Sequence, residues 1–135
     1  MGYKIQEIEG IGPSYGEKLA DANIATTDHL LKLCCDKKGR SSVAKTTGLS
    51  EKLLLKWANI ADLMRISGIG SEFSELLEAA GVDTVKELRH RKADNLAEKM
   101  AEVNKTKKLT RAVPSAKTVA KWVEQAKALD PVITH

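Results

Sequence analysis

The sequence predicts an all-α protein built from two tandem repeats that share one long helix. Of its 135 residues, 42% are hydrophobic, 30% are charged and only 4% are aromatic, which disfavours both a disordered acidic tail and an aromatic-rich β-sandwich. The chain also aligns with itself, and residue types that begin helices recur at matching positions of the two copies. Its length suits one ordinary domain or two small ones.

The repeat is clearest at an offset of 58 residues, which aligns residues 4–30 with 62–88. Nine of the 27 aligned pairs are identical. Each copy carries a Gly-Ile-Gly sequence, at Gly10–Gly12 and at Gly68–Gly70. A helical pattern with an apolar inner face follows each of them.

A second alignment, at an offset of 65 residues, places the eight residues from Ser50 on those from Ser115. The difference between the two offsets predicts seven inserted residues in the second copy, between 89 and 113. Both serines are expected N-caps. Apolar residues at 3.6-residue spacing, with neither Pro nor Gly among them, predict a single helix over 50–67.

Other helix signals agree with this division. Pro13 follows Gly12, where a first-turn proline costs no hydrogen bond, and Thr84 has capping-box spacing to Glu87. We therefore expect a first repeat over residues 1–60, a second over 61–129 that shares helix 50–67, and a C-terminal tail over 130–135.

The glycine sequences lie in a longer pattern, I-x-x-I-x-G-I-G from Ile5 and L-x-x-I-x-G-I-G from Leu63. This pattern resembles the helix-hairpin-helix motif of many DNA repair and replication proteins. From residue 4 to 129 the chain is similar to a prokaryotic helix-hairpin-helix family usually labelled as a domain of unknown function. The resemblance implies an all-α fold of two tandem helix-hairpin-helix repeats, each a helical bundle like SAM domains and the C-terminal domain of RNA polymerase α.

The resemblance also implies a nucleic-acid backbone site at each hairpin. In such motifs, backbone amides of the hairpin and of the next helix hold a phosphate without reading sequence. The isoleucine between the glycines should turn inward. The residues that the resemblance assigns to the backbone site, with Lys4 nearby, are Gly10, Ile11, Gly12, Lys18, Gly68, Ile69 and Gly70.

Two departures favour an alternative in which the hairpins only pack helices. Nucleic-acid-binding members commonly carry Lys or Arg just after the hairpin, whereas this chain has Ser14 and Glu72. Residues 66–88 carry five acids and one lysine, which repel a phosphate. The alternative is a protein-interaction or scaffold module that binds a protein partner or another copy of itself.

Positive charge gathers in the connecting segments. The chain has a net charge of +4, but residues 36–65 carry +4 and residues 89–121 carry +7. A solvated surface, or a patch that neutralises the acidic hairpins, is the plain interpretation. If DNA or RNA binds, the connector residues expected to hold its backbone are Lys37, Lys38, Arg40, Lys45, Arg89, Arg91, Lys92, Lys105, Lys107, Lys108 and Arg111.

We expect no catalytic activity, because no Ser elbow, P-loop or spaced Cys cluster occurs. Trp57 and Trp122 are expected core residues. The adjacent Cys34 and Cys35 cannot form a Cys-x-x-Cys zinc site, and at least one should be buried. We further expect no metal, cofactor, small-molecule substrate or membrane contact, and a cytoplasmic protein.

Overall fold

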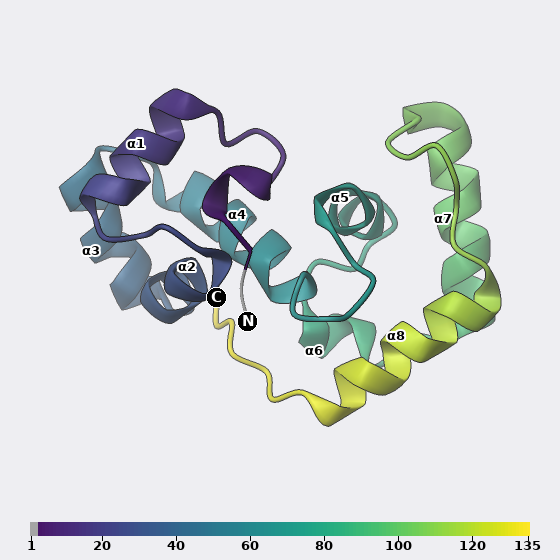
Figure 1. The fold of residues 1–135 in the computed structure, drawn as a ribbon. Helices are drawn as coiled ribbons and strands as arrows, with labels where there is room; N and C mark the ends of the chain where they lie inside the picture. The colour runs from purple at the N-terminus through teal and green to yellow at the C-terminus, as the bar shows by residue number, and fades with distance from the viewer. Residues whose placement is uncertain (1–2) are drawn as a thin grey trace. The chain divides into compact units, whose positions relative to one another are not determined.

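The computed structural model describes residues 3–135, and the prediction of an all-α fold is confirmed for them. This part of the chain contains eight α-helices, one short 3₁₀-helix and no strand (Figure 1). The elements are η1 (Ile5–Glu7), α1 (Pro13–Asp21), α2 (Thr27–Cys34), α3 (Lys37–Thr47), α4 (Glu51–Leu63), α5 (Ser71–Ala79), α6 (Val85–Leu88), α7 (Ala93–Lys107) and α8 (Ala116–Ala128).

Residues 8–30 and 66–88 share a set of backbone hydrogen bonds at an offset of 58 residues. Gly10 and Gly68 have φ angles of +92° and +96°, which glycine adopts at little cost. The matched bonds run from Ile11 N to Ile8 O (3.1 Å) and Ile69 N to Ile66 O (3.1 Å), from Gly16 N to Gly12 O (2.8 Å) and Ser74 N to Gly70 O (3.0 Å), and from Ile24 N to Leu19 O (2.9 Å) and Val82 N to Leu77 O (2.8 Å). The sequence repeat is therefore also a repeat of backbone conformation.

The chain divides into two compact units, one of residues 3–62 with 132–135 and the other of residues 63–131. The sequence had suggested a separate C-terminal tail. In the structure, the end of that tail belongs to the first unit, because Ile133 is buried there and the Thr134 N–H donates a hydrogen bond of 2.8 Å to the carbonyl oxygen of Cys35.

Helix α4 runs unbroken from Glu51 to Leu63, and it ends four residues before the predicted end at residue 67. The Ile66 N–H bonds to the Leu63 carbonyl at 3.1 Å, a tighter turn than the α-helix allows. The chain then enters the glycine turn at Gly68. The helix expected over 50–67 is therefore shorter in the structure. Residues 64–67 belong to the turn that leads into Gly68, not to α4.

The first unit packs α3 against α1 and α2, and η1 against α1. An edge-to-face contact joins the rings of Tyr15 and Trp57, with centroids 5.2 Å apart. Trp57 is 2% exposed, as the core assignment predicted. The core of this unit also contains Ile5, Ile8, Ile11, Leu19, Ile24, Leu30, Cys34, Val43 and Leu54.

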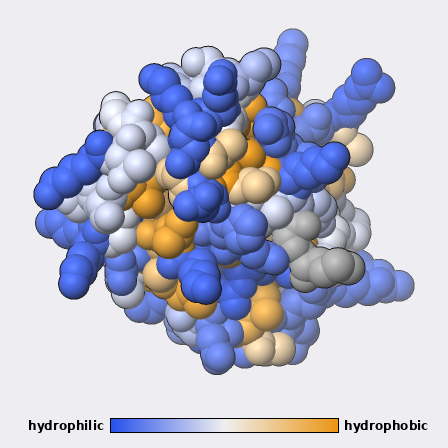
Figure 2. All heavy atoms as spheres, turned by 60° about the vertical axis from the view of Figure 1, so that its left-hand side comes forward, coloured by the Kyte–Doolittle hydropathy of each residue, from blue (hydrophilic) through white to orange (hydrophobic). Residues whose placement is uncertain are grey.

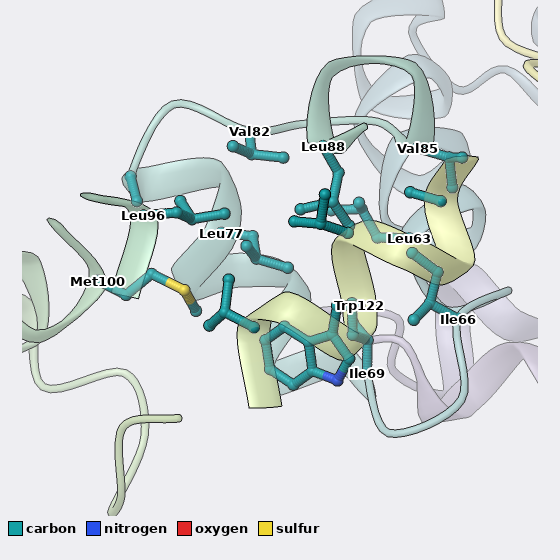
Figure 3. Packing of buried hydrophobic residues seen from close by; sticks show 14 of the residues in the cluster. Leu63, Ile66, Ile69, Leu77, Val82, Val85, Leu88, Leu96, Met100 and Trp122 are labelled. Carbon is teal, nitrogen blue, oxygen red and sulfur yellow. The ribbon is translucent and has the colours of Figure 1, made fainter. Parts of the chain in front are cut away.

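The second unit packs α7 against α5 and α8, and α6 against α8. The rings of Phe73 and Trp122 have centroids 5.3 Å apart and occupy the positions that match the aromatic pair of the first unit. Figure 3 shows the apolar side chains converging between these helices, with Trp122 beside Ile69. The core includes Leu63, Ile66, Ile69, Leu76, Leu77, Val82, Val85, Leu88, Leu96, Met100, Val119, Trp122, Val123 and Ala126.

The extra length of the second copy lies in two places. Helix α7 has 15 residues, whereas α3 has 11, and a longer loop connects α7 to α8. Asn104 holds this loop: its Oδ1 accepts from the Leu109 N–H (2.8 Å) and the Thr110 N–H (3.0 Å). The predicted insertion between 89 and 113 therefore forms a longer helix and a braced loop.

Candidate nucleic-acid interface

The first Gly-Ile-Gly turn, Gly10–Gly12, is open. A methyl group placed on Gly10 or on Gly12 would meet no atom within 4 Å. Gly12 is the N-cap of α1 and brings no capping side chain, so the amides of Ser14 and Tyr15 lack an intrahelical acceptor. Ile11 is 4% exposed and points into the core, as expected. This turn has the backbone geometry and the space that a phosphate group needs.

Lys18 lies in the last turn of α1, six residues beyond Gly12. At 1.5 Å per residue this is roughly 9 Å along the helix axis. Lys18 therefore stands at the opposite end of α1 from the glycine turn. Lys4 is exposed, and its backbone N–H donates to the Glu7 carboxylate at 3.0 Å, so an acid stands beside it.

The second Gly-Ile-Gly turn, Gly68–Gly70, has the same backbone, but two side chains of α8 lie against its first residues. A methyl group on Gly68 would lie 3.1 Å from the indole nitrogen of Trp122. The Gln125 side chain accepts from the Ser67 N–H at 3.0 Å and donates to the Ser67 carbonyl at 3.3 Å. Ile69 is fully buried. Side chains of α8 thus crowd Gly68, whereas a methyl group on Gly70 would meet no atom within 4 Å.

Three of the predicted basic residues gather around a hollow on α3. Lys37, Lys38 and Lys45 recur at helical spacing with Ser41 and Ser42, so that all five line one face of the helix. The hollow has a volume of about 620 Å³, and Glu51 at the start of α4 completes its wall. We call it the α3 hollow.

The α3 hollow joins positive charge to hydroxyl donors. Its three lysines are exposed, as is Ser42, and Ser41 is half-buried. Figure 2 turns the side of the molecule that carries α1 and α3 toward the viewer and shows hydrophilic side chains standing out around patches of apolar surface. The arrangement suits an anion with several oxygen acceptors.

The prediction that Arg40 is one of the connector residues that hold a nucleic-acid backbone is wrong, because its side chain is buried. The side chain is 3% exposed, and its Nη1 and Nη2 donate to the carbonyl oxygens of Cys34 (3.0 Å) and Thr134 (2.7 Å). Because its donors satisfy backbone acceptors inside the first unit, Arg40 holds the unit together and does not face a ligand.

The side chains of Arg89 and Arg91 in the second unit also form hydrogen bonds within their own unit. The Arg89 Nη2 donates to the Lys127 carbonyl at 3.1 Å, which caps the last turn of α8. Arg91 pairs with Glu87 at 2.8 Å and donates to the Gly81 carbonyl at 2.9 Å. Lys92 is exposed and lines a second hollow, of about 410 Å³, together with Arg91.

The cluster from Lys105 to Arg111 spans the end of α7 and the start of its loop. Lys105 and Lys107 lie in the last helical turn, where cations are favoured by the helix dipole. Lys108 is the C-cap, with a left-handed φ of +49°, and Arg111 lies on the loop. All the basic side chains of this cluster are exposed, and they line neither of the two hollows.

The two cysteines differ in burial. Cys34 is fully buried and Cys35 is half-buried, and neither forms a disulfide. Burial raises the pKa of the Cys34 thiol to about 11, and the nearby Arg40 opposes that rise. A thiol with so high a pKa is a poor nucleophile at neutral pH. Within residues 3–135, no three His, Cys, Asp or Glu side chains gather as they would around a metal ion.

The sequence did not indicate Ser41, Ser42 and Lys99, which line the two hollows. It also did not indicate the hydrogen bonds between the Gln125 side chain and the Ser67 backbone. The two serines follow Lys37 and Lys38 by four residues, so helical spacing could have found them. Gln125 contacts a residue 58 positions away, for which no local signal exists.

The fold defines an all-helical protein with a repeated glycine turn, and none of the described helices combines the length and apolar character of a membrane span. The family described as "Domain of unknown function (DUF4332)" matches residues 9–129, and the chain belongs to this family. A search of curated proteins and a search of solved structures found no significant match.

Proposed function

We propose that the chain is a non-catalytic module of two tandem helix-hairpin-helix repeats that binds the nucleic-acid backbone without sequence specificity. The α3 hollow is the observation that carries this proposal. Three lysines around one hollow can neutralise phosphates at successive positions, and the hydroxyls of Ser41 and Ser42 can donate to phosphate oxygens.

The first glycine turn is the second contact that we propose. Gly10 and Gly12 are open to solvent, and α1 begins without a capping side chain. A phosphate oxygen can therefore approach the amides of the first helical turn, where the helix dipole favours an anion. At the second turn Gly70 is equally open, but Trp122 and Gln125 lie against Gly68 and Ser67, and Glu72 adds a negative charge to the first turn of α5. We therefore place the proposed contact at the first turn.

The chemistry of the α3 hollow supports recognition of the backbone rather than of the bases. The residues that line the hollow are lysines, serines and one glutamate, with no aromatic ring on which a base could stack. Contacts to phosphate position a protein on its polymer but carry no sequence information.

The competing function is a protein-interaction or scaffold module. The contacts of Trp122 and Gln125 with Gly68 and Ser67 favour it, because there the turn packs against α8. In that case the lysines of α3 remain solvated and no polyanion binds.

Fluorescence anisotropy with labelled duplex and single-stranded oligonucleotides of unrelated sequence tests the proposal. We expect dissociation constants in the micromolar range at low salt and little difference between sequences. Replacing Lys37, Lys38 and Lys45 by Glu should abolish this binding. The control replaces Lys117, Lys121 and Lys127 of α8, which are also exposed, by Glu. Lys117 and Lys121 line a hollow of about 540 Å³ that contains Glu124, and Lys127 pairs with that glutamate at 3.2 Å, so we expect this variant to bind within a few fold of the unsubstituted protein. Equal effects of the two triple variants would contradict the proposal.

A further inference from the structure

We propose that the hollow at the start of α7 binds a phosphomonoester dianion. This α7 hollow, of about 410 Å³, lies entirely within the second unit. The residues that line it are Ala80, His90, Arg91, Lys92, Asn95, Leu96 and Lys99.

The lining carries positive charge and hydrogen-bond donors; the Glu87 carboxylate, which pairs with Arg91 at 2.8 Å, lies outside it and leaves the charges of Lys92 and Lys99 in excess. Arg91, Lys92 and Lys99 are cationic, and His90 and Asn95 add N–H donors. A dianion gains more than a monoanion from such a set, because each of its charges interacts with every cation around it. A phosphomonoester therefore suits this hollow better than the singly charged diester of a strand interior.

Arg91 is fixed in place before any ligand binds. Its Nε and Nη2 donate to one carboxylate oxygen of Glu87, at 3.1 Å and 2.8 Å, and Nη2 also donates to the Gly81 carbonyl at 2.9 Å. These bonds leave the Nη1 hydrogens without a partner among residues 3–135. A guanidinium held in this way loses little conformational freedom when it binds an anion.

The lysines of the α7 hollow are the adjustable part. Lys92 and Lys99 are exposed, and no ion pair joins either of them to an acid within the described residues. Their ammonium groups can therefore move onto an anion without breaking a bond. Leu96 and Ala80 form the apolar floor of the hollow.

The α7 hollow differs from the α3 hollow in its groups. The α3 hollow is lined by lysines, serines and one glutamate, whereas the α7 hollow adds a guanidinium, an imidazole and an amide. Its volume also exceeds that of a phosphate group, so it has room for the atoms to which the phosphate is bonded. The ligand is either a free phosphate compound or the phosphorylated end of a strand, and both present the same dianion.

An NMR titration with inorganic phosphate at constant ionic strength tests the site itself. We expect saturable shifts of the backbone amides of residues 90–99. The double variant K92Q/K99Q should weaken phosphate binding by about tenfold or more, since it removes two charge-assisted hydrogen bonds. The control K117Q/K121Q removes the same charge from a hollow of α8 that also contains Glu124, and it should leave phosphate binding within twofold. Absent shifts, or shifts of equal size at all lysine-bearing helices, overturn the proposal.

A second arm separates the two sources, and it alone rests on the proposed nucleic-acid function. Anisotropy compares one single-stranded oligonucleotide with and without a 5′-phosphate. Tighter binding of the phosphorylated strand, lost in K92Q/K99Q, assigns the site to strand ends. Phosphate shifts without such a preference assign it to a free phosphate compound. If no oligonucleotide binds while inorganic phosphate still does, the nucleic-acid function fails and the anion site stands.

Discussion

The Arg40 guanidinium donates a hydrogen bond of 2.7 Å to the carbonyl oxygen of Thr134, 94 residues further along the chain. A second bond of 3.0 Å reaches the Cys34 carbonyl, and the Thr134 N–H returns a bond of 2.8 Å to Cys35. The end of the chain is therefore an integral part of the first unit. The sequence places Arg40 in a basic connector, but in the structure its side chain holds the C-terminal residues in the first unit.

Replacing Arg40 by Met should destabilise the first unit by about 2–4 kcal/mol, because the carbonyls of Cys34 and Thr134 lose their donors. Native-state hydrogen exchange measures this effect locally, with the amides of α2 and α3 exchanging faster. The control Lys38→Met lies on the same helix, is exposed and should leave exchange nearly unchanged. Equal protection in the two variants would show that the buried guanidinium adds no stability.

Deleting residues 132–135 should have a similar effect by a different route. The deletion exposes the apolar surface that Ile133 covers and removes the Thr134 bonds. We expect a loss of about 2–3 kcal/mol, the usual value for one buried isoleucine. Urea denaturation followed by tryptophan fluorescence, to which Trp57 and Trp122 both contribute, measures it. A shortened chain as stable as the full one would contradict the assignment of the tail to the first unit.

The stability of the chain should decrease between pH about 9 and about 11 because of Cys34. The folded-state pKa is raised to about 11, so the unfolded thiol ionises at lower pH than the folded one and favours unfolding there. Below pH 9 the contribution of the neutral buried thiol is fully present. The expected loss is about 2–3 kcal/mol, and it should be absent in Cys34→Ala. A pH profile that is the same in both proteins would argue against a buried neutral thiol.

Gly68→Ala should cost more stability than Gly10→Ala. Both substitutions force alanine to a φ above +90°, which costs about 1–2 kcal/mol. Only at Gly68 does the new methyl group also press on the Trp122 indole, at 3.1 Å. Thermal unfolding of the two variants compares them directly. If Gly10→Ala were the less stable of the two, the contact between the Gly68 turn and Trp122 would not limit substitution there.

Local sequence signals predicted the parts of the fold that depend on local physics. Ser50, Thr84 and Ser115 cap helices as expected, and the repeated glycine pattern places Gly10 and Gly68 at positive φ angles. The helix caps follow from residues three positions apart. The sequence repeat supplied the longer correspondence between residues 5–30 and 63–88.

The remaining features depend on contacts between distant residues. No periodicity marks the bond between Arg40 and Thr134, so the basic segment around Arg40 predicts an exposed side chain. The pair of Glu87 and Arg91 does have i, i+4 spacing, and that spacing could have separated Arg91 from the free cations. Charge counting predicts where basic residues occur, whereas burial decides which of them can meet a ligand.

The salt dependence of duplex DNA binding tests the central claim most directly. If the α3 hollow holds phosphates, the logarithm of the association constant should fall with the logarithm of salt concentration with a slope of about −3 or steeper. Replacing Lys37, Lys38 and Lys45 by Gln should make that slope shallower by about 2–3, at roughly 0.9 for each phosphate that is no longer neutralised. The same three substitutions at Lys117, Lys121 and Lys127 should leave it unchanged. A slope near zero in the unsubstituted protein, or one that the α3 substitutions do not alter, would contradict backbone binding at the α3 hollow.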